Sequence, residues 1–223
     1  FDILFLFSDY RKVQAHWNGK VGDVLRQQAE SKGIRLLSFG AYGDSFAIIN
    51  SDRPLRVPAD FKGLKIRGNT PMSIAAIEAL GASPLRLSSS EIYAALQRGT
   101  VDGCATGLGS IIRRKWYEVS GYATITAASY SVWPVMINVN LWNRLPADIQ
   151  EIIATAASEN ENYIISQVEK SDQEYAAQIE NKMKAHVLTE TERDQWKAAL
   201  SSVKDKYIEL AGEEGNRLLQ MVD

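Results

Sequence analysis

An arginine at the end of a short predicted strand is the clearest candidate for a chemical role in this sequence. Residues 63–67 alternate apolar and basic side chains, as a short strand does, and Gly68 and Pro71 then favour a turn and a helix start. In open α/β sheets, small ligands bind outside the carboxyl ends of strands. There the planar guanidinium of Arg67 can donate two parallel hydrogen bonds to a carboxylate. Taken alone, the pattern is more typical of a solvated or ion-paired surface arginine.

Residues that could carry catalysis are scarce. His16 and His186 lie far apart, and neither has the spacing of a metal-binding motif. Cys104 has no histidine beside it in the sequence, so a buried inert thiol is the simpler interpretation. The glycines of residues 103–109 form neither a dinucleotide-binding nor a phosphate-binding loop. We therefore expect a binding protein rather than an enzyme, with no catalytic residue, no cofactor and no metal site of its own.

Composition is that of a globular protein with a sizeable core. The chain has 223 residues, 45% of them hydrophobic, and a formal net charge of −2. That charge provides no broad basic field for nucleic acid, and the basic run at residues 113–115 is best explained as a solvated helix end. No apolar stretch is long enough to span a bilayer, so we expect no direct membrane insertion. The single cysteine leaves the cellular compartment open.

Helical and strand patterns alternate along the first two thirds of the chain. This alternation predicts an α/β fold with largely parallel strands. Helices are expected over 13–25, 72–80, 91–98 and 108–117, and strands near 34–37, 46–50, 63–67, 85–87, 101–105, 123–127 and 132–139.

A much longer helical pattern follows. From Pro146 to Met183 an apolar stripe continues without an internal proline or glycine, which predicts a helix roughly 50 Å long. Because that exceeds one small domain, the helix should brace two lobes. Thr189 and Glu192 then have the spacing of a capping box, and Gly212 is expected to interrupt the last helical segment.

Several motifs agree in order and spacing with one known family. They are residues 63–67 (GLKIR), 79–84 (ALGASP), 91–103 (EIYAALQRGTVDG), 115–119 (KWYEV) and 138–148 (NVNLWNRLPAD). Together they resemble the DctP-type solute receptors of tripartite ATP-independent periplasmic (TRAP) transporters.

The resemblance implies a two-lobed fold like that of type II periplasmic binding proteins, with a long helix spanning both lobes. Residues 1–60 would form the remainder of lobe I, residues 61–145 mostly lobe II with crossover strands, residues 146–183 the long helix, and residues 184–223 C-terminal helices that pack back on the lobes. The segment FLFSD at residues 5–9 matches a stretch normally well inside the first lobe. We therefore expect an N-terminally incomplete chain, without its signal peptide, whose open sheet edge favours association.

The resemblance also implies the function. A receptor of this family binds a small organic anion between its lobes and delivers it to TRAP membrane permease subunits from a periplasmic location. In the family, the arginine that matches Arg67 forms a salt bridge with the substrate carboxylate. The residues expected to contact substrate here are Arg67, Thr106, Trp133, Ser131, Ser89 and Asn69.

Structural explanations compete with a binding role at three of these positions. Ser89 could instead cap the following helix, Trp133 could belong to the core, and Asn69 could serve only the turn. Arg86 is an arginine in a usually uncharged stretch. It could be a surface residue or a second carboxylate contact.

Two departures from the family pattern bear on the ligand. Thr106 stands where a family asparagine is frequent, and Ala47 stands where receptors of sialic acid-like ligands commonly carry a second arginine. The resemblance therefore favours a smaller or less polar acid than sialic acid, while the identity of the acid and any bridging metal stay open.

Two other classes remain as alternatives. A ligand-sensing regulatory module or a small-molecule enzyme could use a related two-lobed fold. The scarcity of catalytic pairs favours transport.

Overall fold

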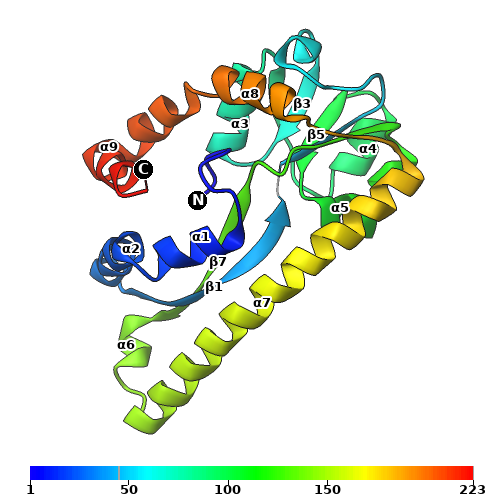
Figure 1. Ribbon diagram of the computed structural model, residues 1–223. Coiled ribbons are helices and arrows are strands. Elements are labelled where there is room, and N and C mark those ends of the chain that lie inside the picture. The colour runs from blue at the N-terminus through cyan, green and yellow to red at the C-terminus, as the bar shows by residue number, and fades with distance from the viewer. Residues whose placement is uncertain (45, 223) are drawn as a thin grey trace.

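The computed structural model describes residues 1–44 and 46–222, which form two lobes joined by crossing strands and one long helix (Figure 1). We use lobe I for the smaller part, built on a two-stranded antiparallel sheet. Its elements are α1 (Tyr10–Trp17), α2 (Lys20–Ser31), β1 (Ile34–Asp44), β7 (Tyr130–Asn138) and the short α6 (Val139–Trp142).

Lobe II is built on a six-stranded sheet. Its strands, in spatial order, are β4 (Ser83–Arg86), β3 (Lys65–Gly68), β5 (Gly103–Thr106), β2 (Ala47–Asn50), β6 (Tyr122–Ile125) and β8 (Lys184–Val187). Its helices are η1 (Pro58–Phe61), α3 (Pro71–Ala79), α4 (Ile92–Gln97), α5 (Leu108–Arg113), η2 (Trp116–Glu118), α8 (Glu190–Ala199) and α9 (Val203–Gln220).

Strand direction in this sheet is mixed, which corrects the expectation of largely parallel strands. β3 runs parallel to both β4 and β5, and β6 runs parallel to β8. β2 is antiparallel to both of its neighbours, β5 and β6. β2 is the strand through which the chain enters lobe II from lobe I. Its direction is opposite to that of the strands in the βαβ units that follow it.

Helices cover both faces of the six-stranded sheet, so its central strands are buried on both sides. Ile48 of β2 packs on one face with residues of α3, α8 and α9, whereas Ile49 packs on the other face with residues of α4, α5 and the end of the long helix. Strands covered on both faces read as continuous apolar runs, and β2 is buried at all of its positions.

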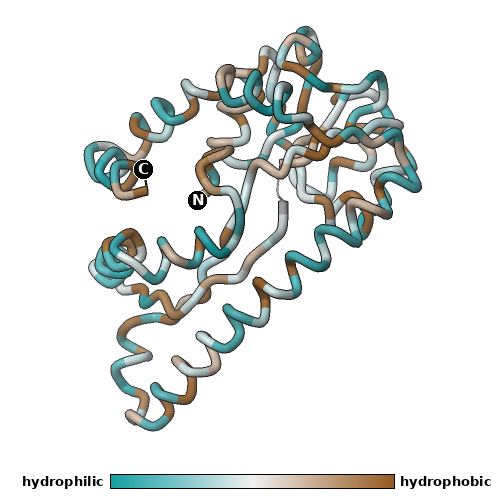
Figure 2. Tube along the Cα trace, viewed as in Figure 1, coloured by the Kyte–Doolittle hydropathy of each residue, from teal (hydrophilic) through white to brown (hydrophobic). Residues whose placement is uncertain are grey.

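The long helix is confirmed. α7 (Ala147–Lys182) has 36 residues and packs against β1 of lobe I and against α5 and β8 of lobe II. At 1.5 Å per residue it is roughly 54 Å long. Figure 2 shows hydrophobic and hydrophilic residues alternating along it, as expected for a helix with one packed face. It therefore braces both lobes.

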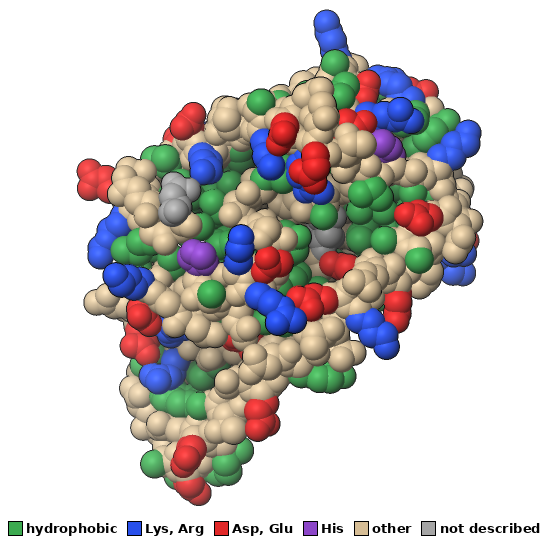
Figure 3. Space-filling view, in the orientation of Figure 1, with side chains coloured by type: hydrophobic (Ala, Val, Ile, Leu, Met, Phe, Trp, Pro, Cys, Tyr) green, Lys and Arg blue, Asp and Glu red, His purple; other side chains and the backbone are tan. Residues whose placement is uncertain are grey.

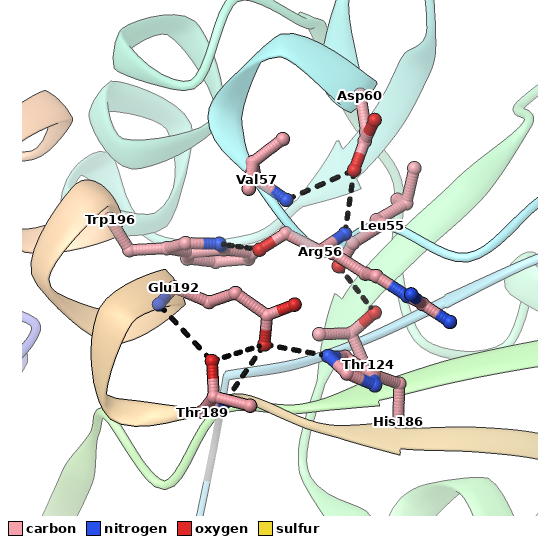
Figure 4. Close-up of polar contacts among 9 residues, drawn as sticks. All are labelled: Leu55, Arg56, Val57, Asp60, Thr124, His186, Thr189, Glu192 and Trp196. Carbon is pink, nitrogen blue, oxygen red and sulfur yellow. Dashed lines mark hydrogen bonds and ion pairs between the residues drawn. The ribbon is translucent and has the colours of Figure 1, made fainter.

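The segment after α7 packs back on lobe II, as the close-up in Figure 4 shows. The capping box predicted for Thr189 and Glu192 is present at the start of α8. Glu192 also lies 2.8 Å from His186 Nε2 on β8, and Trp196 Nε1 donates to the Arg56 carbonyl at 2.8 Å. These contacts fix α8 against β8 and the loop before η1.

Several expected boundaries differ from the structure. The helix predicted over 13–25 is two helices, because Asn18 caps the end of α1 and Gly19 precedes α2. The helix predicted over 108–117 ends at Arg113, and Lys115 takes a left-handed conformation with φ of 55°.

Two further differences concern the C-terminal segment and the lobes. The segment over 184–223 begins with a strand, β8, that was not predicted; after it, Gly212 (φ 67°) interrupts α9 as expected. The sequence predicted that lobe I would extend to about residue 60. In the structure the chain already enters the six-stranded sheet of lobe II at β2, which pairs with β5 and β6.

On the face of the molecule shown in Figure 3, basic and acidic side chains are interspersed. No helix among the described residues is both long enough and apolar enough to cross a membrane.

Candidate ligand-binding site

A cavity of about 560 Å³ lies between the two lobes. Lobe II contributes the ends of β3 and β5 and the start of α5, and lobe I contributes β1, β7 and the first residues of the chain. The lining residues used below are Asp2, Leu4, Tyr42, Phe46, Arg67, Asn69, Ser89, Thr106, Ser110, Arg113, Arg114, Ser131, Val132 and Trp133. All six residues predicted to contact substrate are therefore brought together, although ligand contact itself stays a prediction.

Arg67 lies on β3 at the inner wall of this cavity. Only 4% of its surface is exposed, so the guanidinium is largely removed from water. Its Nε donates to the Leu87 carbonyl at 2.9 Å, and Nη1 makes a longer contact of 3.5 Å with the Ala105 carbonyl. These backbone oxygens orient the guanidinium without neutralising it. No carboxylate among the described residues forms an ion pair with Arg67.

Cys104 is a neighbouring group that could have carried a negative charge beside Arg67. Burial raises the pKa of its thiol to about 12, and the nearby Arg67 only partly opposes this shift. The thiol is therefore neutral at physiological pH, and its Sγ donates to the Ala105 carbonyl. The prediction of a buried cysteine is confirmed.

Three further predicted residues lie around Arg67 on lobe II. Thr106 ends β5 and is buried. Asn69 follows β3, and its backbone N–H donates to Ser73 Oγ at 3.0 Å, so the turn role is real while the exposed side chain faces the cavity. The capping alternative for Ser89 is wrong, because α4 begins at Ile92 and its N-cap residue, Glu91, makes no side-chain capping bond.

On lobe I, Ser131 and Trp133 lie on the same strand, β7. Ser131 Oγ donates to Asp2 Oδ1 at 2.7 Å. Trp133 is 64% exposed, so the alternative that it belongs to the core is wrong. Its indole stacks on the ring of Tyr42 from β1, with ring centroids 5.6 Å apart and an interplanar angle of 24°.

A side-chain contact between the lobes lies beside the cavity. Tyr42 Oη and Ser110 Oγ of α5 are 2.7 Å apart. The same stretch of β1 is held by Tyr10, whose hydroxyl donates to the Gly43 carbonyl at 2.9 Å and accepts from the Gly43 N–H at 2.8 Å. The lobes are thus in contact beside the cavity.

Sequence reasoning missed several residues of the site. Tyr42 and Asp2 gave no local signal, because their role arises from strand pairing and from the chain's path across the cleft. Arg113 and Arg114 were correctly expected at a solvated helix end, since both are exposed at the end of α5, but they also line the cavity.

Other candidate residues lie outside the cavity. Arg86 is exposed on β4, which agrees with its surface interpretation. His16 Nδ1 contacts the Lys12 carbonyl, and His186 pairs with Glu192, so both histidines have structural contacts. No group of three or more potential metal-binding side chains occurs within the described residues.

Comparison with known sequences identifies the family. Residues 1–210 match the DctP family, described as bacterial extracellular solute-binding protein, family 7. The chain belongs to this family. It is 34% identical, over 96% of its length, to the C4-dicarboxylate-binding periplasmic protein DctP of Rhodobacter capsulatus. It is 32% identical, over its whole length, to the 2,3-diketo-L-gulonate-binding periplasmic protein YiaO of Escherichia coli.

Solved structures agree with this assignment. The chain superposes on a TRAP periplasmic solute-binding protein from Desulfovibrio salexigens with bound orotic acid, with a TM-score of 0.89 and 28% identity, over 99% of this chain and 72% of the other. The two-lobed α/β fold and the family resemblance are therefore confirmed. The chain spans 65% of the DctP relative and 67% of YiaO, about two thirds of each.

The family description and the relatives' names agree on location. The family is extracytoplasmic, and both relatives named above are periplasmic proteins. The periplasmic localisation expected from the sequence is in accord with both.

Proposed function

We propose that this protein is the periplasmic receptor of a TRAP transporter, which encloses a small organic acid between its lobes and delivers it to the membrane permease. Binding occurs without chemical change to the ligand. Arg67 holds the ligand carboxylate, while Thr106, Ser89 and Asn69 from lobe II and Ser131 and Trp133 from lobe I complete the contacts.

The observation that carries this proposal is the state of Arg67. A guanidinium with 4% exposure and no carboxylate partner among the described residues is a buried charge without its counter-ion. An uncompensated buried charge costs several kcal/mol, so a carboxylate that enters the cavity gains strongly from pairing with it. The planar fork of arginine, with N–H donors left on both Nη atoms, suits a carboxylate better than a lysine would.

The relatives support the substrate class. The names of two relatives specify C4-dicarboxylates and 2,3-diketo-L-gulonate, and a solved relative holds orotic acid. All of these ligands carry a carboxyl group, which is the group that Arg67 can recognise.

Enclosure by both lobes supplies the remaining affinity. Micromolar binding requires about 8 kcal/mol, whereas an exposed ion pair contributes about 1 kcal/mol or less. The cavity has walls from both lobes, and the Tyr42–Ser110 contact joins them, so a bound acid is shielded from water on two sides.

The test is calorimetry on Arg67→Ala and Arg67→Lys with a panel of organic acids. We expect Arg67→Ala to weaken binding of every acid by at least about a hundredfold, and Arg67→Lys to restore only part of it. Arg86→Ala is the matched control, because Arg86 lies on the neighbouring strand β4 but is exposed and does not line the cavity.

Unchanged affinity in a folded Arg67→Ala variant would contradict the assignment. The catalytic alternative has its own readout, since conversion of a bound acid to a product during incubation would show an enzyme.

A further inference from the structure

Tyr42 and Trp133 form a continuous aromatic surface on the lobe I wall of the cavity, which we call the aromatic platform. Their rings are stacked at 5.6 Å, and both side chains line the cavity opposite the polar residues of lobe II. Tyr42 is 38% exposed and Trp133 is 64% exposed. Large aromatic surface left open inside a cavity gains free energy when a ligand covers it.

The platform has one face available. Tyr42 covers one face of the Trp133 indole, so most of the exposed surface of Trp133 lies on the other side and at the edge. Ser110 on α5 holds the Tyr42 hydroxyl at 2.7 Å, which fixes the ring behind Trp133. The indole is therefore presented to the ligand by a supported stack rather than by a loose side chain.

The two walls differ in chemistry, which sets the orientation of a ligand. Lobe II supplies the Arg67 guanidinium and the hydroxyl of Thr106. The platform supplies the large exposed apolar surface of the lining, because Leu4 and Phe46 are buried in the lobe II core and Val132 packs against the lobe I core. An amphipathic acid fits this arrangement, with its carboxylate on Arg67 and its apolar body on the platform.

The carboxylate of Asp2 lies beside the platform and disfavours a second negative charge on the part of the ligand that covers the platform. Ser131 and Trp133 are two residues apart on β7, so their side chains leave the same side of the strand, and Ser131 holds Asp2 at 2.7 Å. A second anionic group placed over the platform would approach Asp2, a like charge.

Two arginines at the cavity rim do not offset the negative charge of Asp2 beside the platform. Arg113 donates to Tyr175 Oη at 3.0 Å and lies over the same ring, and Arg114 lies over the ring of Trp116. Both are exposed, so solvent screens them, and they attract an anion toward the cavity rather than fix a second carboxylate on the platform.

We propose that the ligand is a ring-bearing monocarboxylic acid whose ring lies flat on Trp133, and that the platform selects ring acids over open-chain acids. This inference rests on the proposed function, since it requires the carboxylate on Arg67. The cavity volume of about 560 Å³ is in the range of about 300–1,000 Å³ typical of small-molecule sites, and so leaves room for a ring.

Calorimetry with four probes tests the inference: benzoate, cyclohexanecarboxylate, hexanoate and succinate. Benzoate and hexanoate carry the same charge and differ chiefly in the ring. We expect the protein to bind the two ring acids about five- to tenfold more tightly than hexanoate and succinate. Trp133→Leu should remove this preference by weakening the ring acids, and Trp133→Phe should keep most of it. The exposure of Trp133 makes both variants compatible with folding, which thermal melts would verify.

The outcomes separate the two proposals. If the acids bind in an Arg67-dependent way but ring acids have no advantage, or if Trp133→Leu keeps the advantage, the platform inference is overturned and the receptor function stands. If none of the four probes binds, the platform inference is overturned; if binding survives Arg67→Ala, both proposals are overturned. Phthalate adds a second carboxylate to benzoate, and phthalate binding more tightly than benzoate would also contradict the role given to Asp2.

Discussion

At the scale of single residues, the site depends on a charge that the fold orients but does not neutralise. Backbone carbonyls of Leu87 and Ala105 position Arg67, and the neighbouring Cys104 remains a neutral thiol. The position of Arg67 at a strand end before a helix start was predictable from local residues, whereas its role as a ligand contact came from the family resemblance and stays a prediction. It could not reveal Tyr42 or Asp2, since their position in the site depends on pairing and crossing of distant segments.

Cys104 gives a prediction about pH. Its pKa rises from an ordinary value of 9.0 to about 12 on folding, so the unfolded chain loses this proton at lower pH than the folded chain does. The free energy of unfolding should therefore fall as pH rises from about 9 toward 12, and Cys104→Ala should lessen that fall.

The same shift predicts low reactivity. At pH 8.5, iodoacetamide should leave the folded protein unlabelled and should label it fully in guanidinium chloride, because the thiolate is the nucleophile. Rapid labelling of the folded protein, followed by mass spectrometry, would show that the thiol is neither buried nor neutral.

At the scale of elements, the long helix α7 joins the two lobes, and the capped helix α8 fixes the C-terminal segment against lobe II. The long α7 was predictable because its apolar stripe is uninterrupted, and the capping box of α8 was predictable from two residues. The strand β8 was missed because its few residues, partly exposed at a sheet edge, carry little pattern. The direction of β2 was also missed, since periodicity does not report the direction of a strand.

The capping network of α8 should contribute measurably to stability. Thr189→Ala removes the side chain that accepts from the Glu192 N–H, and we expect it to lower the free energy of unfolding by about 1 kcal/mol in a denaturant titration. The exposed Glu190, on the same helix, provides the control Glu190→Gln, which should change stability little.

Glu192 makes that contribution dependent on pH. Partial burial would raise its pKa, but hydrogen bonds from Thr189 and His186 outweigh this effect and hold the pKa below its usual value of 4.5. The stabilisation is thus present above about pH 4.5 and is lost as pH falls through the lower, folded-state pKa. Glu192→Gln should destabilise the protein at pH 7 and have less effect at pH 3; an equal effect at both values would rule out this ionic contribution.

The contact between Tyr42 and Ser110 should favour the closed arrangement of the lobes. Tyr42→Phe keeps the aromatic ring and removes only the hydroxyl, so we expect ligand affinity to fall by up to about tenfold while ring stacking is retained. Calorimetry measures this change, and an affinity equal to that of the unaltered protein would show that the contact does not contribute to closure.

At the scale of the whole molecule, β7 of lobe I leaves apolar side chains exposed. Trp133, Val135 and Met136 are all exposed, and among the described strands β7 pairs only with β1. A partly uncovered strand with apolar side chains invites pairing with another chain.

We therefore expect the 223-residue chain to self-associate at micromolar concentrations, and Met136→Lys to reduce this association. Light scattering coupled to size-exclusion chromatography would measure both. A monodisperse monomer of 24.8 kDa would contradict the expectation.

The most direct test of the central claim is a crystal structure of the protein with its bound acid. The account predicts a carboxylate of the ligand beside Arg67, with two oxygens about 2.7–2.9 Å from its guanidinium nitrogens. A ligand bound elsewhere, or a guanidinium that pairs with an acidic side chain of the protein while the ligand is present, would contradict it.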